Sequence, residues 1–364
     1  MNIVHVVGTG TIGEPLIGLL ADHKADFGIE EVTFHKRTPL ITERGKVNDL
    51  VRRGAVLAVD EDKRSSFEEL GHTPKWEARE AIERASVVID CTPVGNDNKA
   101  EFYDSAPNPK GFMAQGSEFG FGKMYARGIN DDSLVRGVDR FLHIVSCNTH
   151  NIAVLIKTLA MDTDGTNHLT DGRFVCIRRS NDISQDSGFA PSPTVERHKD
   201  DRFGTHHARD AHGLFETLGY DLNLFSSALK LNSQYMHQIH FSLTLDREMD
   251  LDEVRERLAA NKRVAITYKK SANSVFSFGR DHGYYGRILS QTVVAIDTVT
   301  VRNGNELVGY CFTPQDGNPL LSTLSESEFG RSMRQTVPPE IGEKEMILRH
   351  NQGRDGDERP RVGG

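Results

Sequence analysis

The sequence predicts an α/β protein that begins with a doubly wound parallel sheet and continues into an α+β unit with a mixed or antiparallel sheet. Three observations lead to this fold class. Strand-like and helix-like segments alternate from the first residues onward, which is typical of parallel sheets. A glycine-rich turn separates the first strand from the first helix. Beyond residue 146 the alternation gives way to longer strands with few helices between them.

The first part of the chain, residues 1–146, is expected to form one domain around its parallel sheet. The apolar run Ala85 to Asp90 has the continuous hydrophobicity of a strand buried on both faces. A helix is expected from Pro15 to Asp22, where apolar residues recur at helical spacing. The other expected strands are Ile3 to Val7, Glu31 to Phe34, Gly111 to Gln115 and Phe141 to Ser146.

The second part, residues 147–320, is expected to form a catalytic domain. Helices are predicted at Asn148 to Ala160 and at Leu251 to Ala260. The stretch Ser180 to His212 is rich in Pro, Asp and His, and its length marks a candidate functional loop. Strands are expected at Arg173 to Arg178, Met236 to Leu245, Val264 to Tyr268, Gln291 to Val301 and Leu307 to Phe312.

A C-terminal segment, residues 321–337, is expected to pack back on the first domain through a short helix at Glu326 to Gln335. The remaining tail, residues 338–364, is rich in Gly, Arg, Asp and Glu, and we expect it to be disordered. We derive no role for this tail.

Composition restricts the classes of function. At 364 residues the chain exceeds the roughly 250 to 300 at which a single core stops growing, so two domains are expected. No apolar run is long enough for a membrane span, and no signal peptide precedes the first strand, so we expect a cytoplasmic protein. The net charge of -8 without a basic block excludes nucleic acid as an electrostatic partner, which leaves a small molecule. Four separated cysteines without a CxxC pair argue against disulfides and a thiolate zinc site.

The turn reads Gly-Thr-Gly-Thr-Ile-Gly and stands where dinucleotide-binding sheets of Rossmann type place it. The first glycine permits the tight turn, the second lets the backbone approach a pyrophosphate, and the third allows close helix packing. The helix N-terminus adds amide donors for the phosphates. A chance glycine cluster is the alternative, which the flanking strand and helix disfavour. The candidate cofactor-binding residues here are Gly8, Gly10, Thr11, Ile12 and Gly13.

The end of the second strand points to the choice of dinucleotide. An NAD site usually carries an acidic residue about 20 positions after the turn. This chain has Lys36, Arg37 and Thr38 there, which suit a ribose phosphate through charge-assisted hydrogen bonds. We therefore expect NADP, or use of both NADP and NAD. A solvated basic turn is the alternative interpretation.

Cys147 is the candidate nucleophile. It stands at the junction of the two expected domains, just before the predicted helix. Amide donors and the helix dipole at such a position lower the pKa of a thiol and favour the reactive thiolate. Taken alone, a single cysteine is more often a small buried hydrophobe.

The motifs in their order resemble the archaeal type of glyceraldehyde-3-phosphate dehydrogenase, from Met1 to about Leu245. The resemblance is carried by the glycine-rich turn and by six further motifs: Val88-Ile89-Asp90-Cys91-Thr92-Pro93 with Gly95, Gln115-Gly116-Ser117-Glu118, Val145-Ser146-Cys147-Asn148-Thr149, Arg178-Arg179, Thr205-His206-His207 with Asp210, and Met236-His237-Gln238.

The resemblance implies reversible, phosphorylating oxidation of glyceraldehyde 3-phosphate to 1,3-bisphosphoglycerate in glycolysis or gluconeogenesis. Cys147 would form a thiohemiacetal and then a thioester, and His237 would be the general base. It also implies cofactor contacts from Thr92, Pro93, Gly95, Gln115 and Gly116, and a homotetramer.

The substrate and inorganic phosphate would be held by anion-binding residues. Guanidinium groups bind phosphate in a bidentate fork, and neighbouring strand residues point to opposite faces, so one arginine of the pair is expected to face the site. The candidates are Asn148, Thr149, Arg178, Arg179, His206 and His207. The spacing of His206, His207 and His212 does not support a metal site, and none is predicted.

The chain departs from the family pattern around the nucleophile. His150 and Asn151 stand where the family has Thr and Gly, Arg209 is added beside the double histidine, and the C-terminal third diverges. A related semialdehyde or sugar-phosphate aldehyde dehydrogenase, and a non-catalytic NADP-binding sensor, therefore remain alternatives. The residues do not decide whether phosphate or water resolves the thioester.

Overall fold

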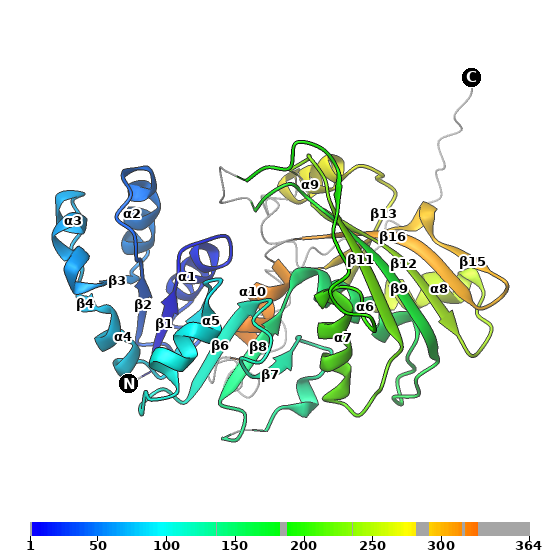
Figure 1. Cartoon of the computed structure of the whole chain (residues 1–364), viewed down its shortest axis with the longest axis horizontal. Helices are drawn as coiled ribbons and strands as arrows, with labels where there is room; N and C mark the ends of the chain where they lie inside the picture. Colours follow the sequence, from blue (N-terminus) through cyan, green and yellow to red (C-terminus); the bar gives the residue numbers. More distant parts are fainter. Residues whose placement is uncertain are drawn as a thin grey trace.

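The computed structural model describes residues 2–135, 137–182, 188–234, 236–281, 291–314 and 317–326. The elements gather around two large sheets, which Figure 1 shows side by side with α10 between them. All strand pairs of the first sheet are parallel. Its strands are β1 (Ile3–Val7), β2 (Glu31–His35), β3 (Val56–Val59), β4 (Trp76–Glu77), β5 (Val87–Asp90), β6 (Gly111–Gly116), β7 (Lys123–Tyr125) and β8 (Phe141–Val145).

The strand order of this sheet is β4-β3-β2-β1-β5-β6-β8-β7. The chain therefore winds outward from β1 to β4 and returns to the other side of β1 with β5. Ligands of open α/β sheets bind at such a reversal, outside the carboxyl ends of the strands. The register aligns those ends, because Val7 pairs with both His35 and Asp90.

The second sheet is mixed, with strand order β10-β11-β9-β12-β16-β14-β13 and β15 paired to β16. Its central pairs, β9 with β12 and β12 with β16, are antiparallel. The strands are β9 (Leu169–Arg178), β10 (Thr194–Val195), β11 (Leu224–Lys230), β12 (His237–Leu245), β13 (Val264–Thr267), β14 (Thr292–Ala295), β15 (Thr300–Arg302) and β16 (Glu306–Thr313). The predicted fold class is confirmed.

Helices cover the sheets and connect their strands (Figure 1). Those of the N-terminal part are α1 (Gly13–Asp22), α2 (Arg44–Arg52), α3 (Arg64–Glu69), α4 (Ala78–Arg84) and α5 (Gly95–Asn98). Those of the C-terminal part are α6 (Cys147–Leu159), α7 (His206–Glu216), α8 (Leu251–Ala260), α9 (Ala272–Asp281) and α10 (Gly317–Glu326). No helix in the described part of the chain has the length and apolar character needed to cross a bilayer.

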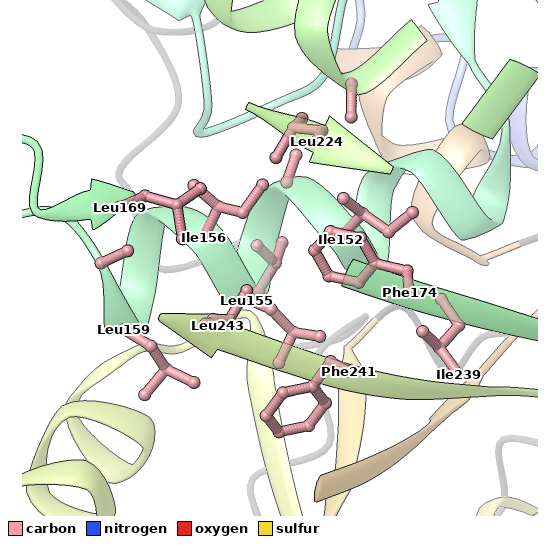
Figure 2. Close-up of a cluster of buried hydrophobic side chains, with 14 of the residues drawn as sticks. Ile152, Leu155, Ile156, Leu159, Leu169, Phe174, Leu224, Ile239, Phe241 and Leu243 are labelled. Carbon is pink, nitrogen blue, oxygen red and sulfur yellow. The ribbon is translucent and has the colours of Figure 1, made fainter. Parts of the chain in front are cut away.

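The core of the second sheet forms on α6. Figure 2 shows Ile152, Leu155, Ile156 and Leu159 of this helix among apolar side chains of β9, β11 and β12. Most residues of α6 are buried, polar ones included, because the helix has sheet strands, α7, α8 and α10 around it. This packing fixes the direction of the helix and therefore the place of its first residue, Cys147.

Two sequence predictions are wrong in this part of the chain. The stretch Ser180 to His212 is not wholly a loop, because it contains β10 and the start of α7, so the double histidine lies on a helix. The single strand expected over Gln291 to Val301 is two strands, β14 and β15, separated by a 3₁₀ turn. The helix α7 was not predicted, because its sequence is rich in polar residues and its apolar face is short.

The last described helix is α10, which begins at Gly317 and was not among the predicted elements. Leu320 and Leu324 of α10 pack into the core of the first sheet. The helix predicted at Glu326 to Gln335 lies outside the described residues except for Glu326, and the tail 338–364 lies outside them entirely. Several elements have no counterpart among the predictions, including α2 and β11.

Candidate functional site

The glycine-rich turn has the geometry that a dinucleotide site requires. Gly8 has a φ of 95°, which favours glycine, and its amide donates to the carbonyl of His35 at 3.2 Å. A Cβ at Gly13 would lie 2.0 Å from the Gly8 carbonyl oxygen, so only glycine fits there. A Cβ at Gly10 would meet nothing within 4 Å. The backbone at Gly10 is thus open to a ligand, while Gly8 and Gly13 lie close together and close the turn.

The other residues predicted to bind the cofactor follow neighbouring strands of the same edge. Thr92 follows β5, and both its amide and its hydroxyl donate to the buried carboxylate of Asp90, at 2.8 and 2.6 Å. Gly95 begins α5, and a Cβ there would crowd Ala114 and Glu118 at 3.2 Å. Its small size therefore has a packing reason. Pro93 lies between these two residues.

Gln115 and Gly116 end β6 beside the junction of the two sheets. The side-chain amide of Gln115 donates to Thr323 of α10 at 2.5 Å, and its Oε1 is buried without a partner among the described residues. Gly116 has a φ of 86°, and its carbonyl contacts His143 Nε2 at 2.8 Å. The edge thus contains an unused buried acceptor, which fits a site for a polar ligand.

The charges at the end of β2 differ from those predicted, because a carboxylate lies among the cations. Lys36 is buried, and its ammonium contacts the carboxylate of Glu43 at 2.5 Å. Arg37 and Thr38 are exposed. Sequence reasoning missed Glu43, because it comes from a 3₁₀ turn after the strand (Ile41–Glu43) rather than from the strand end itself. No spacing rule would have identified it.

Cys147 is the first residue of α6. Ser146 caps the helix, with Oγ accepting from the amide of Thr149 at 3.4 Å and contacting its hydroxyl at 2.9 Å. Thr149, predicted as a phosphate contact, is fully buried in this capping turn. Asn148 is also buried, and its Oδ1 has no partner among the described residues. The predicted helix start is therefore confirmed to within one residue.

The surroundings of Cys147 oppose the predicted activation of its thiol. Burial raises the pKa of Cys147 from 9.0 to about 11, against the opposing effects of Arg179 and of the Asn148 amide. Asp182 raises it further. The helix terminus is present as expected, but desolvation outweighs it.

His237 begins β12 on the neighbouring sheet. The backbone amide of Arg179 donates to its Nδ1 at 3.1 Å. Burial lowers the pKa of this imidazole to about 3, and the positive charges of Arg179 and Arg178 add to the effect. His237 is therefore neutral, and because Nδ1 accepts a hydrogen bond, Nε2 carries the hydrogen.

The two arginines face different surroundings, as expected for neighbouring residues at a strand end. The side chain of Arg179 is only 6% exposed and lies close enough to Cys147 and His237 to lower both of their pKa values. Arg178 is half-buried, and its guanidinium donates to Glu196 at 2.6 Å. Arg179 is thus the buried member of the pair, and Glu196 neutralises much of Arg178.

The double histidine starts α7 with its rings 3.9 Å apart. Burial lowers the pKa of His206 to about 4 and that of His207 well below its ordinary value. Neither ring nitrogen of His207 has a hydrogen-bond partner among the described residues. Among the residues that the structure describes, no cluster of His, Cys, Asp or Glu has the arrangement of a metal site. The histidines are thus neutral groups with free hydrogen-bonding capacity.

The residues that depart from the family pattern are anchored inside the protein. His150 Nε2 contacts Ser322 of α10 at 2.7 Å, and Asn151 donates to Thr313 of β16 at 2.8 Å. Arg209 stacks on Phe119, 4.0 Å from the ring centre, and pairs with Asp210. Arg209 therefore has protein partners.

Asn318 of α10 is a further residue that the sequence did not indicate. Its side-chain amide donates to the carbonyl oxygen of Cys147 at 3.1 Å and to Asn151 Oδ1 at 3.2 Å. Burial of Asn318 next to Cys147 depends on the packing of α10, which is not among the predicted elements. No motif marks this contact.

The fold and site together define a protein with a Rossmann-type sheet and a cysteine at the junction with a second, mixed sheet. No protein-family profile matches the chain. The chain is 28% identical to a glyceraldehyde-3-phosphate dehydrogenase of Methanobacterium bryantii, over 73% of this chain and 74% of the relative. It is 24% identical to that of Pyrobaculum arsenaticum, over 84% and 85%. It is 25% identical to glyceraldehyde-3-phosphate dehydrogenase 2 of Methanosarcina acetivorans, over 66% and 69%. These similarities confirm the relationship to the archaeal type of glyceraldehyde-3-phosphate dehydrogenase.

Proposed function

We propose that the protein is a glyceraldehyde-3-phosphate dehydrogenase that oxidises its aldehyde through a thioester on Cys147 and passes the product to inorganic phosphate. The observation that carries the proposal is the place of Cys147. It follows β8 of the parallel sheet, begins α6, and lies near Arg179 of the second sheet. The printed names of the relatives support the same activity. We extend the proposal to a homotetramer, which rests on the family resemblance.

In this proposal residues 1–146 hold a nicotinamide dinucleotide and residues 147–320 hold the aldehyde. The open backbone at Gly10 and the N-terminus of α1 that follows suit the pyrophosphate. The unused Oε1 of Gln115 suits a polar group near the junction. Thr92, Pro93, Gly95 and Gly116 complete the proposed edge. When bound, the dinucleotide supplies the acceptor for the hydride that leaves the substrate carbon.

Cys147 forms the carbon–sulfur bond. With a pKa of about 11, the thiol must first lose its proton to solvent. Arg179 and the Asn148 amide stabilise the resulting thiolate, because both lower the pKa. Attack on the aldehyde carbon then turns the carbonyl oxygen into an alkoxide. Loss of hydride from that carbon leaves the thioester.

His237 acts as a hydrogen-bond donor in this scheme. Its Nε2 carries the hydrogen and can donate to the alkoxide oxygen, as donors of an oxyanion hole do. The general-base role predicted from the sequence is disfavoured, because a group with a pKa of about 3 holds a thiol proton poorly. That role would also require the bond from the Arg179 amide to Nδ1 to break.

Inorganic phosphate resolves the thioester. A phosphate oxygen attacks the thioester carbon, the carbon–sulfur bond breaks, and the thiolate returns with release of 1,3-bisphosphoglycerate. The buried guanidinium of Arg179 and the single N–H of neutral His207 suit the two phosphate groups as donors. Asn148 lies beside Cys147 in the chain and His206 beside His207, and we propose supporting contacts from both.

A second candidate substrate class is another phosphorylated aldehyde or a semialdehyde. It is favoured by the pairing of Arg178 with Glu196, because this leaves fewer free cations for a substrate phosphate than the resemblance implies. The retained Cys147 would perform the same oxidation. The non-catalytic alternative has no observation in its favour.

The test follows the absorbance of reduced cofactor with glyceraldehyde 3-phosphate, in phosphate, in arsenate and in neither. We expect reduction that requires phosphate or arsenate. Reduction independent of both would replace the phosphorylating reaction by hydrolysis of the thioester. Reduction only with other aldehydes would favour the second candidate, and binding of dinucleotide without any reduction would contradict the proposal.

A further inference from the structure

A three-member ion cluster lies at the end of β2 and the start of α2. Glu43, the residue before α2, contacts Lys36 Nζ through one carboxylate oxygen at 2.5 Å and Lys46 Nζ through the other at 2.6 Å. All three side chains are largely buried. One carboxylate therefore uses both of its oxygens on two ammonium groups.

The cluster borders the glycine-rich turn directly. Lys46 also donates to the carbonyl oxygen of Thr9 at 3.1 Å and lies 3.8 Å from the carboxylate of Glu14 in α1. Val7 and His35 are register partners, so Gly8 and Lys36 leave their strands at the same level of the edge. In sheets of this type the adenosine ribose of a bound dinucleotide lies between the first turn and the end of the second strand.

The cluster adds a carboxylate to an edge where the strand end alone offers only cations. Burial opposes ionisation of Glu43, but the hydrogen bonds and charges of Lys36 and Lys46 prevail and lower its pKa, so it is ionised at neutral pH. A ribose hydroxyl can donate to such a carboxylate. A ribose phosphate would instead place a second anion against it, and like charges at contact lower affinity.

The other charged groups nearby do not replace the two lysines. Arg37 is exposed, and its charge acts on Asp60, which follows β3 and pairs with His35 at 3.1 Å. Thr38 is exposed and uncharged. Of the two cations on which an NADP preference would rest, Lys36 is thus paired with Glu43, and Arg37 is exposed to solvent.

We propose that Glu43 is a specificity-determining residue that selects the free 2′-hydroxyl of NAD and discriminates against the 2′-phosphate of NADP. The inference rests on the proposed function for dinucleotide binding at this edge, and it reverses the preference expected from Lys36, Arg37 and Thr38. Glu43 performs the task of the acidic residue that is missing from the strand end.

Calorimetric titration of the full chain with two adenosine fragments tests this without catalysis. The probes are adenosine 5′-monophosphate and adenosine 2′,5′-bisphosphate, which differ only in the 2′-phosphate. The proteins are the unchanged chain, Glu43→Gln and the control Glu69→Gln, which removes the same charge from an exposed position of α3. Glutamine keeps the shape and one acceptor oxygen, but it removes the charge and leaves one of the two lysines without an acceptor.

We expect the unchanged chain and E69Q to bind the monophosphate at least as tightly as the bisphosphate. In E43Q the affinity ratio should shift toward the bisphosphate by about tenfold or more. An unchanged ratio in E43Q, or an equal shift in E69Q, would refute the role of Glu43 and leave the proposed function intact. Failure of the unchanged chain to bind both fragments and both dinucleotides would overturn the inference and the proposed function together.

Discussion

At the scale of single residues, Cys147 and His237 suit the expected thioester reaction but not the expected transfer of a proton between them. Cys147 is half-buried, His237 is buried and both are uncharged, with the thiol pKa raised to about 11 and the imidazole pKa lowered to about 3. A transfer of the thiol proton to this imidazole is strongly uphill. We therefore infer that the thiol loses its proton to solvent and that Arg179 stabilises the thiolate. His237 stabilises the oxygen anion.

The two roles of His237 give different results for a pair of substitutions. Gln places a donor near the position of Nε2 but cannot accept a proton, whereas Ala removes both functions. We expect H237Q to keep kcat within about tenfold and H237A to lose about 100- to 1,000-fold, as when one oxyanion donor is removed. Stopped-flow assays measure both values. Equal, large losses in both variants would restore the general-base role.

At the scale of elements, α6 and α10 are joined by buried polar contacts behind the nucleophile. Asn151 of α6 donates to Thr313 and accepts from Thr292 at 2.9 Å and from Asn318 at 3.2 Å. One amide thus connects two helices and two strands of the second sheet. Such a network of buried hydrogen bonds holds its elements in one arrangement.

Replacement of Asn151 by Ala should destabilise the protein, because four buried groups lose a hydrogen bond: the Phe312 carbonyl and the side chains of Thr313, Thr292 and Asn318. We expect the free energy of unfolding to fall by about 1 to 3 kcal/mol, measured by urea titration. Asn223→Ala is the matched control, since its bonds to Thr170 and Asp171 are exposed, and it should change stability by less than about 0.5 kcal/mol. Similar losses in the two variants would show that the network adds nothing.

Prediction from the sequence succeeded where one local pattern determines the structure. The turn from Gly8 to Gly13 and the start of α6 at Cys147 follow from steric and capping rules that act within a few residues. Glu43 and Asn318 could not be predicted, because their contacts depend on how distant segments pack. The prediction of a lowered thiol pKa for Cys147 failed for the same reason, since burial is a property of the whole fold.

At the scale of the whole molecule, buried neutral histidines should make the fold sensitive to acid. Burial lowers the pKa of His5 and His237 to about 3, and that of His150 and His206 to about 4, from 6.5. Between these values and 6.5 the unfolded chain binds more protons than the folded one. Stability therefore rises as pH rises through this window and is lost as pH falls through it.

Urea titrations at several pH values across this window measure the effect. The free energy of unfolding should increase toward neutral pH. The raised carboxyl pKa values of Asp210, about 6, and of Glu118 act in the opposite sense, but they are outnumbered by the histidines. A free energy of unfolding that stays flat or falls from acid to neutral pH would contradict the buried, neutral state of these side chains.

The thioester on Cys147 is the central claim, and a rapid-mixing experiment without phosphate or arsenate tests it most directly. Enzyme, cofactor and glyceraldehyde 3-phosphate are mixed, reduced cofactor is followed, and the quenched protein is digested for mass spectrometry. The account predicts a burst of one reduced cofactor per chain, an acyl group on the Cys147 peptide, and neither in Cys147→Ser. A burst that persists in Cys147→Ser, or an acyl group on Cys91, Cys176 or Cys311 instead, would contradict it.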